Sequence, residues 1–95
     1  MEINIKHQNK ETKGIFFIQE GAKMVAEMTY SKAGNDKIII DHTHVDESLT
    51  GEGVGAKLVK AGVDYARKNS LKILPLCPFA NAEFKKHPEY DDVRA

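Results

Sequence analysis

The sequence predicts an α+β domain, in which an antiparallel four-stranded meander precedes a helix, a parallel strand and a short C-terminal helix. Two observations support this prediction. In the first half, apolar and polar residues alternate in short runs separated by turn residues, which is typical of half-buried strands. In the second half, apolar residues recur at spacings of three and four, as on one face of a helix. The 95 residues have room for one core, so we expect a single domain over 1–95.

Four strands are expected before residue 46. Turn residues separate them, clearly at Glu20-Gly21 and at Gly34-Asn35-Asp36. Connections this short join antiparallel neighbours. The run Ile38-Ile39-Ile40 suggests that the fourth strand is buried on both faces at its start. The expected strands are Ile3–His7, Lys13–Glu20, Lys23–Ser31 and Lys37–Val45.

A helix of about four turns is expected next. Its apolar residues recur at helical spacing from Val54 to Ala66. The basic pair Arg67-Lys68 suits the negative end of a helix dipole, and Asn69 is a plausible stop.

The last part of the chain predicts one short strand and one short helix. Leu71–Leu74 is a strand candidate that Pro75 ends, parallel to the fourth strand because a helix connects the two. A helix is expected over Asn81–Lys86, before Pro88. Asp91-Asp92 is expected in a frayed tail.

Charge and cysteine content narrow the class of protein. Fourteen basic and fourteen acidic side chains give a formal net charge of zero. This balance does not favour binding to nucleic acid or to an anionic membrane. The start of the chain lacks an apolar signal stretch, and no segment is long enough to span a bilayer. Cys77 is the only cysteine, which fits a reducing compartment. We therefore expect a cytoplasmic protein whose oligomeric state the sequence leaves open.

The most informative segment is the glycine-rich turn Thr50–Leu58. Its three glycines stand at alternate positions before the helix, where they permit positive φ and close backbone approach. The first helical turn leaves N–H groups unpaired, and such donors suit a phosphate or pyrophosphate. The segment lacks the Gly-Lys-Ser/Thr ending of a P-loop and the context of a dinucleotide fingerprint. A glycine-rich helix start without a ligand is the alternative.

Three ordered motifs resemble the GNAT superfamily of acyl-CoA-dependent N-acetyltransferases, in its short single-domain branch. They are the glycine turn, the strand segment Ile40–Val45 before it, and Pro75-Leu76-Cys77-Pro78-Phe79 after the helix. The match spans Lys13 to Tyr90. Thr50 departs from the Arg or Gln usual in the family. Few residues separate the first two strands, so the helices that usually form one wall of the acceptor site are missing.

The resemblance implies that the chain binds the coenzyme A of acetyl-CoA and transfers its acyl group to an amine, either a small molecule or a peptide. It places the pyrophosphate on backbone N–H groups of the turn and the pantetheine arm beside the fourth strand. It also places the last helix beside the arm and the thioester. The cofactor-binding residues expected on this basis are Val45, Thr50, Gly51, Glu52, Gly53, Val54, Gly55, Ala56, Lys57, Asn81 and Phe84.

Three side chains are candidates for the chemistry. Transfer to an amine requires a base, and His42 and His44 lie two apart on a strand and so share one face. The alternative is that one of them is a packed, hydrogen-bonded strand residue and the other is merely solvated. Two imidazoles are too few ligands for a zinc site, so we expect no metal. Cys77 could accept the acyl group as a nucleophile or be a small buried hydrophobe. A non-enzymatic acyl-CoA binder or sensor, and a module without any ligand, are the other functions considered.

Overall fold

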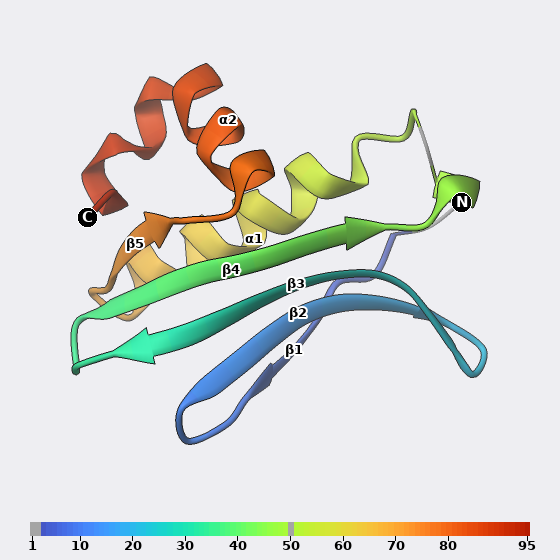
Figure 1. Ribbon diagram of the computed structural model, residues 1–95, viewed down its shortest axis with the longest axis horizontal. Helices are drawn as coiled ribbons and strands as arrows, with labels where there is room; N and C mark the ends of the chain where they lie inside the picture. Colours follow the sequence, from blue (N-terminus) through green and yellow to red (C-terminus); the bar gives the residue numbers. More distant parts are fainter. Residues whose placement is uncertain (1–2, 50) are drawn as a thin grey trace.

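A computed structural model of the chain describes residues 3–49 and 51–95. Five strands form one mixed sheet in chain order, accompanied by two α-helices and two 3-10 turns (Figure 1). None of the helices in this described part is long and apolar enough to cross a membrane. The elements are β1 (Lys6–Asn9), β2 (Lys13–Glu20), β3 (Lys23–Ala33), β4 (Lys37–Val45), η1 (Glu47–Leu49), α1 (Val54–Lys68), β5 (Lys72–Pro75), α2 (Pro78–Lys86) and η2 (Pro88–Val93).

The predicted α+β architecture is confirmed. Strands β1 to β4 pair antiparallel as a meander, and β5 pairs parallel to β4 after the α1 crossover. The first strand begins later than predicted, at Lys6, because Ile3 and Ile5 pack against the core before strand pairing starts. The second helix begins three residues earlier than predicted, with Pro78 in its first turn, where a missing N–H removes no helical hydrogen bond.

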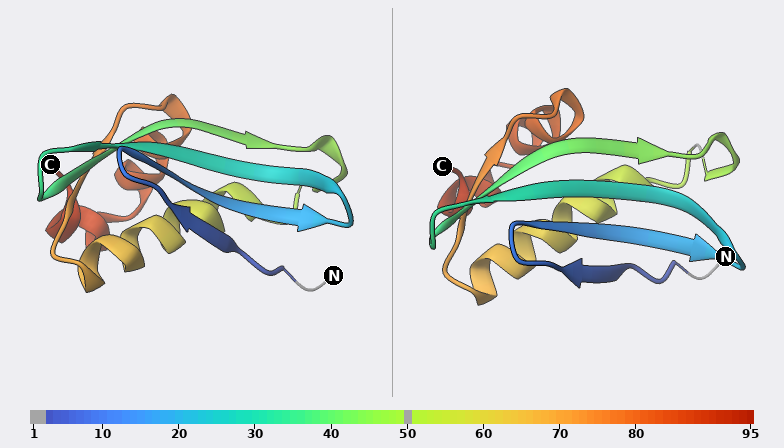
Figure 2. Two further views of the ribbon diagram at one scale, coloured as in Figure 1. Left: turned by 90° about the horizontal axis from the view of Figure 1, so that it is seen from below. Right: turned by 60° about the horizontal axis from the view of Figure 1, so that its bottom comes forward.

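Helix α1 covers one face of the sheet, and the core lies between them (Figure 2). The α1 residues Leu58, Val59 and Val63 are fully buried there, and Gly62 lets the helix approach Met28 of β3. Burying these apolar surfaces between helix and sheet is the main driving force for the fold.

The opposite face of the sheet, which we call the open face, has no helix over it in the described part of the chain (Figure 2). Cross-strand pairing places Ile15, Thr29 and His42 on it, one residue out of phase with the inward-facing Met28. Ile39 shares this face and is only half-buried, so the prediction that the start of the fourth strand is buried on both faces was wrong. The physical reason is that no second helical layer covers the strand.

The C-terminal segment is ordered, and the prediction of a frayed tail at Asp91-Asp92 was wrong. Tyr90 and Val93 of η2 are buried in the main core. Arg67 near the end of α1 donates two hydrogen bonds to the Asp92 carboxylate, at 3.0 and 2.9 Å. The N–H of Ala95 donates to the carbonyl of Ile73, which ties the segment to β5.

Candidate functional site

A shallow groove of about 420 Å³ lies where the start of α1 meets α2 and the end of β4. Most of the glycine turn contributes to it, and that this turn binds a phosphate stays a prediction. The groove also takes in side chains of α2 that the glycine motif does not include. Its lining residues are Val45, Leu49, Gly51, Gly53, Val54, Gly55, Ala56, Phe79, Glu83 and Lys86.

The glycine turn presents backbone donors to this groove. Gly51 and Gly53 have φ of 89° and 66°, a left-handed conformation that side-chain-bearing residues rarely adopt. Gly53 caps α1 without any side-chain hydrogen bond, and the first turn of the helix carries no acidic residue. Among the described residues, no side-chain cap takes up the N–H groups that open α1, from Val54 to Ala56, at the positive end of this 15-residue helix.

Phe79 lies against the start of α1. A Cβ built on Gly55 would come within 2.5 Å of the Phe79 ring, so the ring would have to move for a larger residue to fit at this contact. The ring is 40% exposed and forms part of the groove wall. Phe79 belongs to the Pro75–Phe79 motif but was not predicted as a site residue, because its contact with α1 depends on the tertiary packing of α2.

The groove also contains the one buried charged side chain of the described residues, Glu83, at 5% exposed. Its carboxylate lies 3.4 Å from the Lys86 ammonium and 3.6 Å from Nε2 of His87. The Lys86 ammonium, one turn away on α2, compensates the charge of this carboxylate at the groove wall.

The other expected cofactor-binding residues are placed differently. Glu52 and Lys57 are exposed beside the turn without lining the groove. The Asn81 carboxamide oxygen accepts a 3.4 Å hydrogen bond from Arg94, and Phe84 is 1% exposed, with its ring packed edge-on against Tyr90. Neither lines the groove. Thr50 lies outside the described residues.

Cys77 lies at the point where β4 and β5 part. The last β4–β5 pair is Ile40 with Pro75, and the Cys77 N–H then donates to the Ile40 carbonyl at 3.0 Å. Beyond this bond β4 continues, while the chain from Cys77 turns into α2. The thiol is 6% exposed, and its sulfur lies 3.5 Å from Oγ1 of Thr43.

The surroundings of Cys77 lower the pKa of its thiol. Burial, the largest single effect, opposes ionisation. Hydrogen bonds from the Thr43 hydroxyl and from the N–H groups of Ala80 and Phe79 together outweigh it, so the pKa of the Cys77 thiol lies below its ordinary value. Thr43 of β4 and the start of α2, rather than an imidazole, supply these donors.

The two histidines do not join Cys77. Their rings lie parallel, with centroids 6.4 Å apart, and both are exposed on the open face. Thr43 between them points to the opposite face, toward the thiol. Both imidazoles are accessible to solvent from that side. Among the described residues, no group of three His, Cys, Asp or Glu side chains could hold a metal ion.

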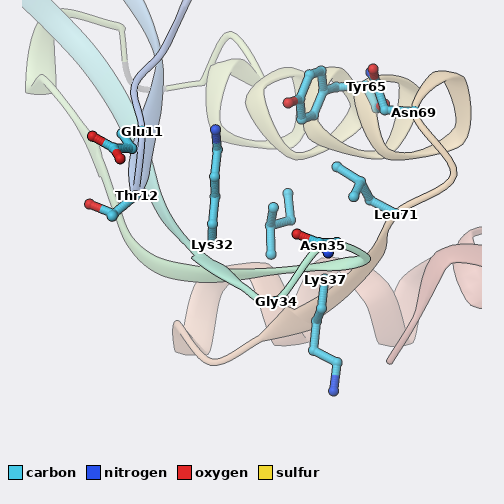
Figure 3. A pocket seen from close by; sticks show the side chains of 10 residues that line it. Glu11, Thr12, Lys32, Gly34, Asn35, Lys37, Tyr65, Asn69 and Leu71 are labelled. Atoms are coloured by element: carbon cyan, nitrogen blue, oxygen red, sulfur yellow. The ribbon is translucent and has the colours of Figure 1, made fainter.

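A second, larger cavity of about 540 Å³ lies at the opposite end of α1 (Figure 3). The turn between β3 and β4 forms one side, and Tyr65 and Asn69 of α1 form the other. Lys32 extends from β3 into the space between them (Figure 3). None of the site residues expected from the sequence lines this cavity, whose walls are largely polar.

Comparison with solved structures shows the same fold in acetyltransferases. A GCN5-like protein from Staphylococcus aureus is 42% identical, with a TM-score of 0.76 over 98% of this chain and 88% of that one. The ribosomal-protein-S18-alanine N-acetyltransferase of Escherichia coli is 17% identical, with a TM-score of 0.64 over 82% of this chain and 53% of that one. The chain thus spans about half the length of the latter enzyme.

A third structure contains the ligand that the glycine turn suggests. A protein of Bacillus anthracis assigned as a streptothricin acetyltransferase was solved with acetyl coenzyme A. It is 19% identical, with a TM-score of 0.60 over 82% of this chain and 47% of that one, which shows the shared fold. No curated protein matches the chain significantly.

The family model described as GCN5-related N-acetyl-transferase matches residues 15–93, which include the whole groove, Cys77 and both strand histidines. This match covers most of the chain and agrees with the motifs and the sheet order. The chain belongs to the GCN5-related N-acetyltransferase family.

Proposed function

We propose that the chain binds acetyl-CoA in the groove at the start of α1 and transfers its acetyl group to an amine. One observation carries this proposal. The donor-rich turn and the thiolate-favouring Cys77 lie at the two ends of β4 residues 40–45, on the side of the sheet where the helices pack. A phosphate-bearing thioester that extends along β4 would therefore meet both.

The groove is suited to such a ligand. The N–H groups from Val54 to Ala56 would hold the pyrophosphate, with Lys86 as the nearest cation of the groove wall. Phe79 and Val45 offer apolar surface for the pantetheine arm between them. Phe84, in the core beneath, would support α2 without touching the ligand.

We propose that Cys77 carries the acetyl group in transit. Its thiolate would attack the thioester carbonyl, and the coenzyme A thiolate would leave as the carbon–sulfur bond breaks. An unprotonated amine would then attack the acetyl carbon on Cys77, and the Cys77 thiolate would leave as its bond to that carbon breaks. The proton that the amine loses would pass to solvent, because His42 and His44 lie on the opposite face of the sheet from the thiol. Direct attack of the amine on acetyl-CoA is the simpler route that the experiments distinguish.

A thermal-shift titration with acetyl-CoA tests the binding step. A ligand at 100 times its Kd stabilises the folded state by about 2.7 kcal/mol. For a domain of this size that raises the Tm by on the order of 10 °C. We expect this shift with acetyl-CoA and not with ATP or NAD. If none of the three ligands raised the Tm, the proposal would be overturned.

A pair of variants with equal charge change localises the ligand. Ala56→Glu places a carboxylate among the turn donors and should abolish the shift. Lys60→Gln, one turn further along the exposed side of α1, should leave it unchanged. Equal shifts in both variants would place the ligand elsewhere.

Mass spectrometry tests the role of Cys77. With acetyl-CoA and no amine, we expect one added acetyl group on the Cys77 peptide, which an amine then removes. Thr43→Val should slow this acetylation because it removes a hydrogen bond that favours the thiolate, whereas Thr29→Val on the open face should not. Turnover with an unmodified Cys77 would support direct transfer, and binding without turnover would identify an acyl-CoA sensor.

A further inference from the structure

The larger cavity, at the end of α1 away from the groove, has no part in the proposed acetyl transfer. Its volume of about 540 Å³ lies within the range of small-molecule sites. Three parts of the chain that are distant in the sequence line it: the β1–β2 turn, the end of β3 with the following turn, and the end of α1 (Figure 3). The polar groups that converge here from separate elements make the cavity a candidate for a second ligand.

Lys32 is a cation on the side of the sheet that α1 covers. It follows Met28 and Tyr30 at alternate positions of β3, and it pairs with the buried Ile38 of β4. Lys32 takes the next inward position, where the apolar core ends, and its half-buried side chain extends into the cavity (Figure 3). Within residues 3–49 and 51–95, no ion pair involves its ammonium. An anion in the cavity would therefore be attracted to it.

The charges around the cavity favour an anion with a single charge. Lys37 also contributes to the wall, but its side chain extends away from the space that Lys32 enters (Figure 3). Glu11 brings a carboxylate to the same wall, and the end of α1 adds the negative pole of the helix dipole. One inward ammonium beside these two sources of negative potential compensates a carboxylate better than it compensates a phosphate dianion.

The remaining polar groups suit the hydroxyl groups of a ligand. Asn69 donates from Nδ2 to the Tyr65 carbonyl at 2.8 Å, which leaves its carboxamide oxygen to accept a hydrogen bond. The Tyr65 hydroxyl and the Asn35 carboxamide add further donors and acceptors to the walls. Apolar surface is the smaller part of the lining, so a hydrocarbon chain would gain little here.

We propose that this cavity binds a small monocarboxylate that carries hydroxyl groups. Its carboxylate binds the Lys32 ammonium, and its hydroxyl groups bind Tyr65, Asn69 and Asn35. The cavity and the groove lie at opposite ends of α1, so this inference does not depend on the proposed acetyl transfer and goes beyond it.

Four probes separate the contribution of the charge from that of the hydroxyl groups. Gluconate has one carboxylate and five hydroxyl groups, hexanoate has only the carboxylate, glucose has only hydroxyl groups, and inorganic phosphate has a higher charge. In NMR titrations of the whole chain, we expect gluconate to give saturable amide shift changes at 34–38 and 65–71. Its Kd should be lower than that of each other probe by about tenfold or more, the scale of one charge-assisted hydrogen bond.

Three results would overturn the proposal: no saturable change with gluconate, a Kd for gluconate equal to that of another probe, or changes confined to other segments.

His7 offers an independent readout of where the carboxylate binds. Its ring lies edge-on to that of Tyr65, with centroids 4.6 Å apart. Burial, and secondarily the charge of Lys32, lower the pKa of His7. A carboxylate on Lys32 offsets that charge, so gluconate should raise the pKa of His7, followed through the imidazole proton shifts, and glucose should not. An unchanged pKa at saturating gluconate would contradict binding at Lys32.

Two lysine variants with the same charge change localise the anion. Lys32→Met should weaken gluconate binding by about tenfold or more, because it removes the inward ammonium. Lys37→Met is the control and should leave the Kd nearly unchanged, since this side chain extends away from the cavity. An unchanged Kd in Lys32→Met, or an equal loss in both variants, would overturn the proposal.

Tyr65→Phe keeps the ring and serves if the amide spectrum shows that Lys32→Met is unfolded. It should weaken the binding of gluconate and not that of hexanoate, because only gluconate has hydroxyl groups for Tyr65. An unchanged gluconate Kd in this variant would count against the proposal in the same way.

Discussion

At the residue scale, two glycines lie under aromatic rings, and replacing them with alanine should affect stability differently. A Cβ on Gly14 would meet the Tyr30 ring at 2.1 Å, and that ring is buried among Phe16, Tyr65 and His7. Because the ring has no space to move, we expect Gly14→Ala to lower the free energy of unfolding by about 1–3 kcal/mol. Urea denaturation would measure the loss, and an unchanged midpoint would contradict it.

Gly55→Ala is the matched case for an exposed ring. Its Cβ would also overlap an aromatic ring, that of Phe79, but this ring is partly exposed and can turn into solvent. Alanine also favours the helix by up to about 1 kcal/mol over glycine, which offsets the displacement. We expect a urea midpoint close to that of the parent protein but weaker acetyl-CoA binding, since Phe79 leaves the groove. A large loss of stability would show that the contact is structural.

His7 should make the domain sensitive to mild acid. Its ring stacks on Phe16 at 4.1 Å, and Nε2 lies 2.7 Å from the Tyr30 hydroxyl. Burial, and secondarily the charge of Lys32, lower the pKa of His7 in the folded state. The unfolded chain therefore takes up the proton more readily, so stability is full above about pH 6.5 and falls as the pH decreases below it.

The urea midpoint at pH 7.5 and pH 5.5 measures this effect. We expect a lower midpoint at pH 5.5 for the parent protein, and a smaller difference for His7→Gln, which cannot gain the proton. Equal differences in the two proteins would assign the pH dependence to other groups.

At the scale of elements, η2 should contribute through burial more than through its ion pair. Tyr90 is buried and contacts Phe84, whereas the Arg67–Asp92 pair is largely exposed. We expect Tyr90→Ala to cost about 3 kcal/mol of unfolding free energy. Arg67→Gln should cost about 1 kcal/mol or less, since exposed ion pairs contribute little. Urea denaturation of both variants would show which one loses more unfolding free energy. A larger loss in Arg67→Gln would contradict the prediction that burial dominates.

This segment also shows where prediction from sequence failed among the elements. Strands β2 and β4 were bounded correctly because alternation and turn residues are local signals. The order of η2 was missed because one pair of apolar residues at a spacing of three, Tyr90 and Val93, is too short a pattern to indicate a periodic element. Their burial depends on the surface that α1 and α2 present, which only the folded chain forms. The half-burial of Ile39 was missed for the same reason, because the sequence does not indicate which face of the sheet a helix covers.

At the scale of the molecule, six of the ten residues that line the groove are among those that the sequence predicts to bind the cofactor. The glycine turn could be predicted directly from the spacing of its glycines, and Val45 was expected from the family resemblance. Phe79 and Glu83 come from α2, and their place opposite the turn results from the packing of α2 on α1. The separation of His42 from Cys77 could have been found from strand alternation, because Thr43, between the two histidines, faces the other way.

The groove therefore joins segments from two parts of the chain, and a ligand there should stabilise both. With acetyl-CoA we expect slower amide hydrogen exchange over 45–56 and over 77–86, because a bound ligand suppresses local opening of the elements that it bridges. Exchange in β1 and β2, which contribute nothing to the groove, should stay the same. The larger cavity provides an internal comparison, since its walls at 34–38 and 65–71 are separate segments. Protection confined to those walls would place acetyl-CoA at the far end of α1 and contradict the proposed site, whereas protection of both groove segments would show that α1 and α2 close on the ligand together.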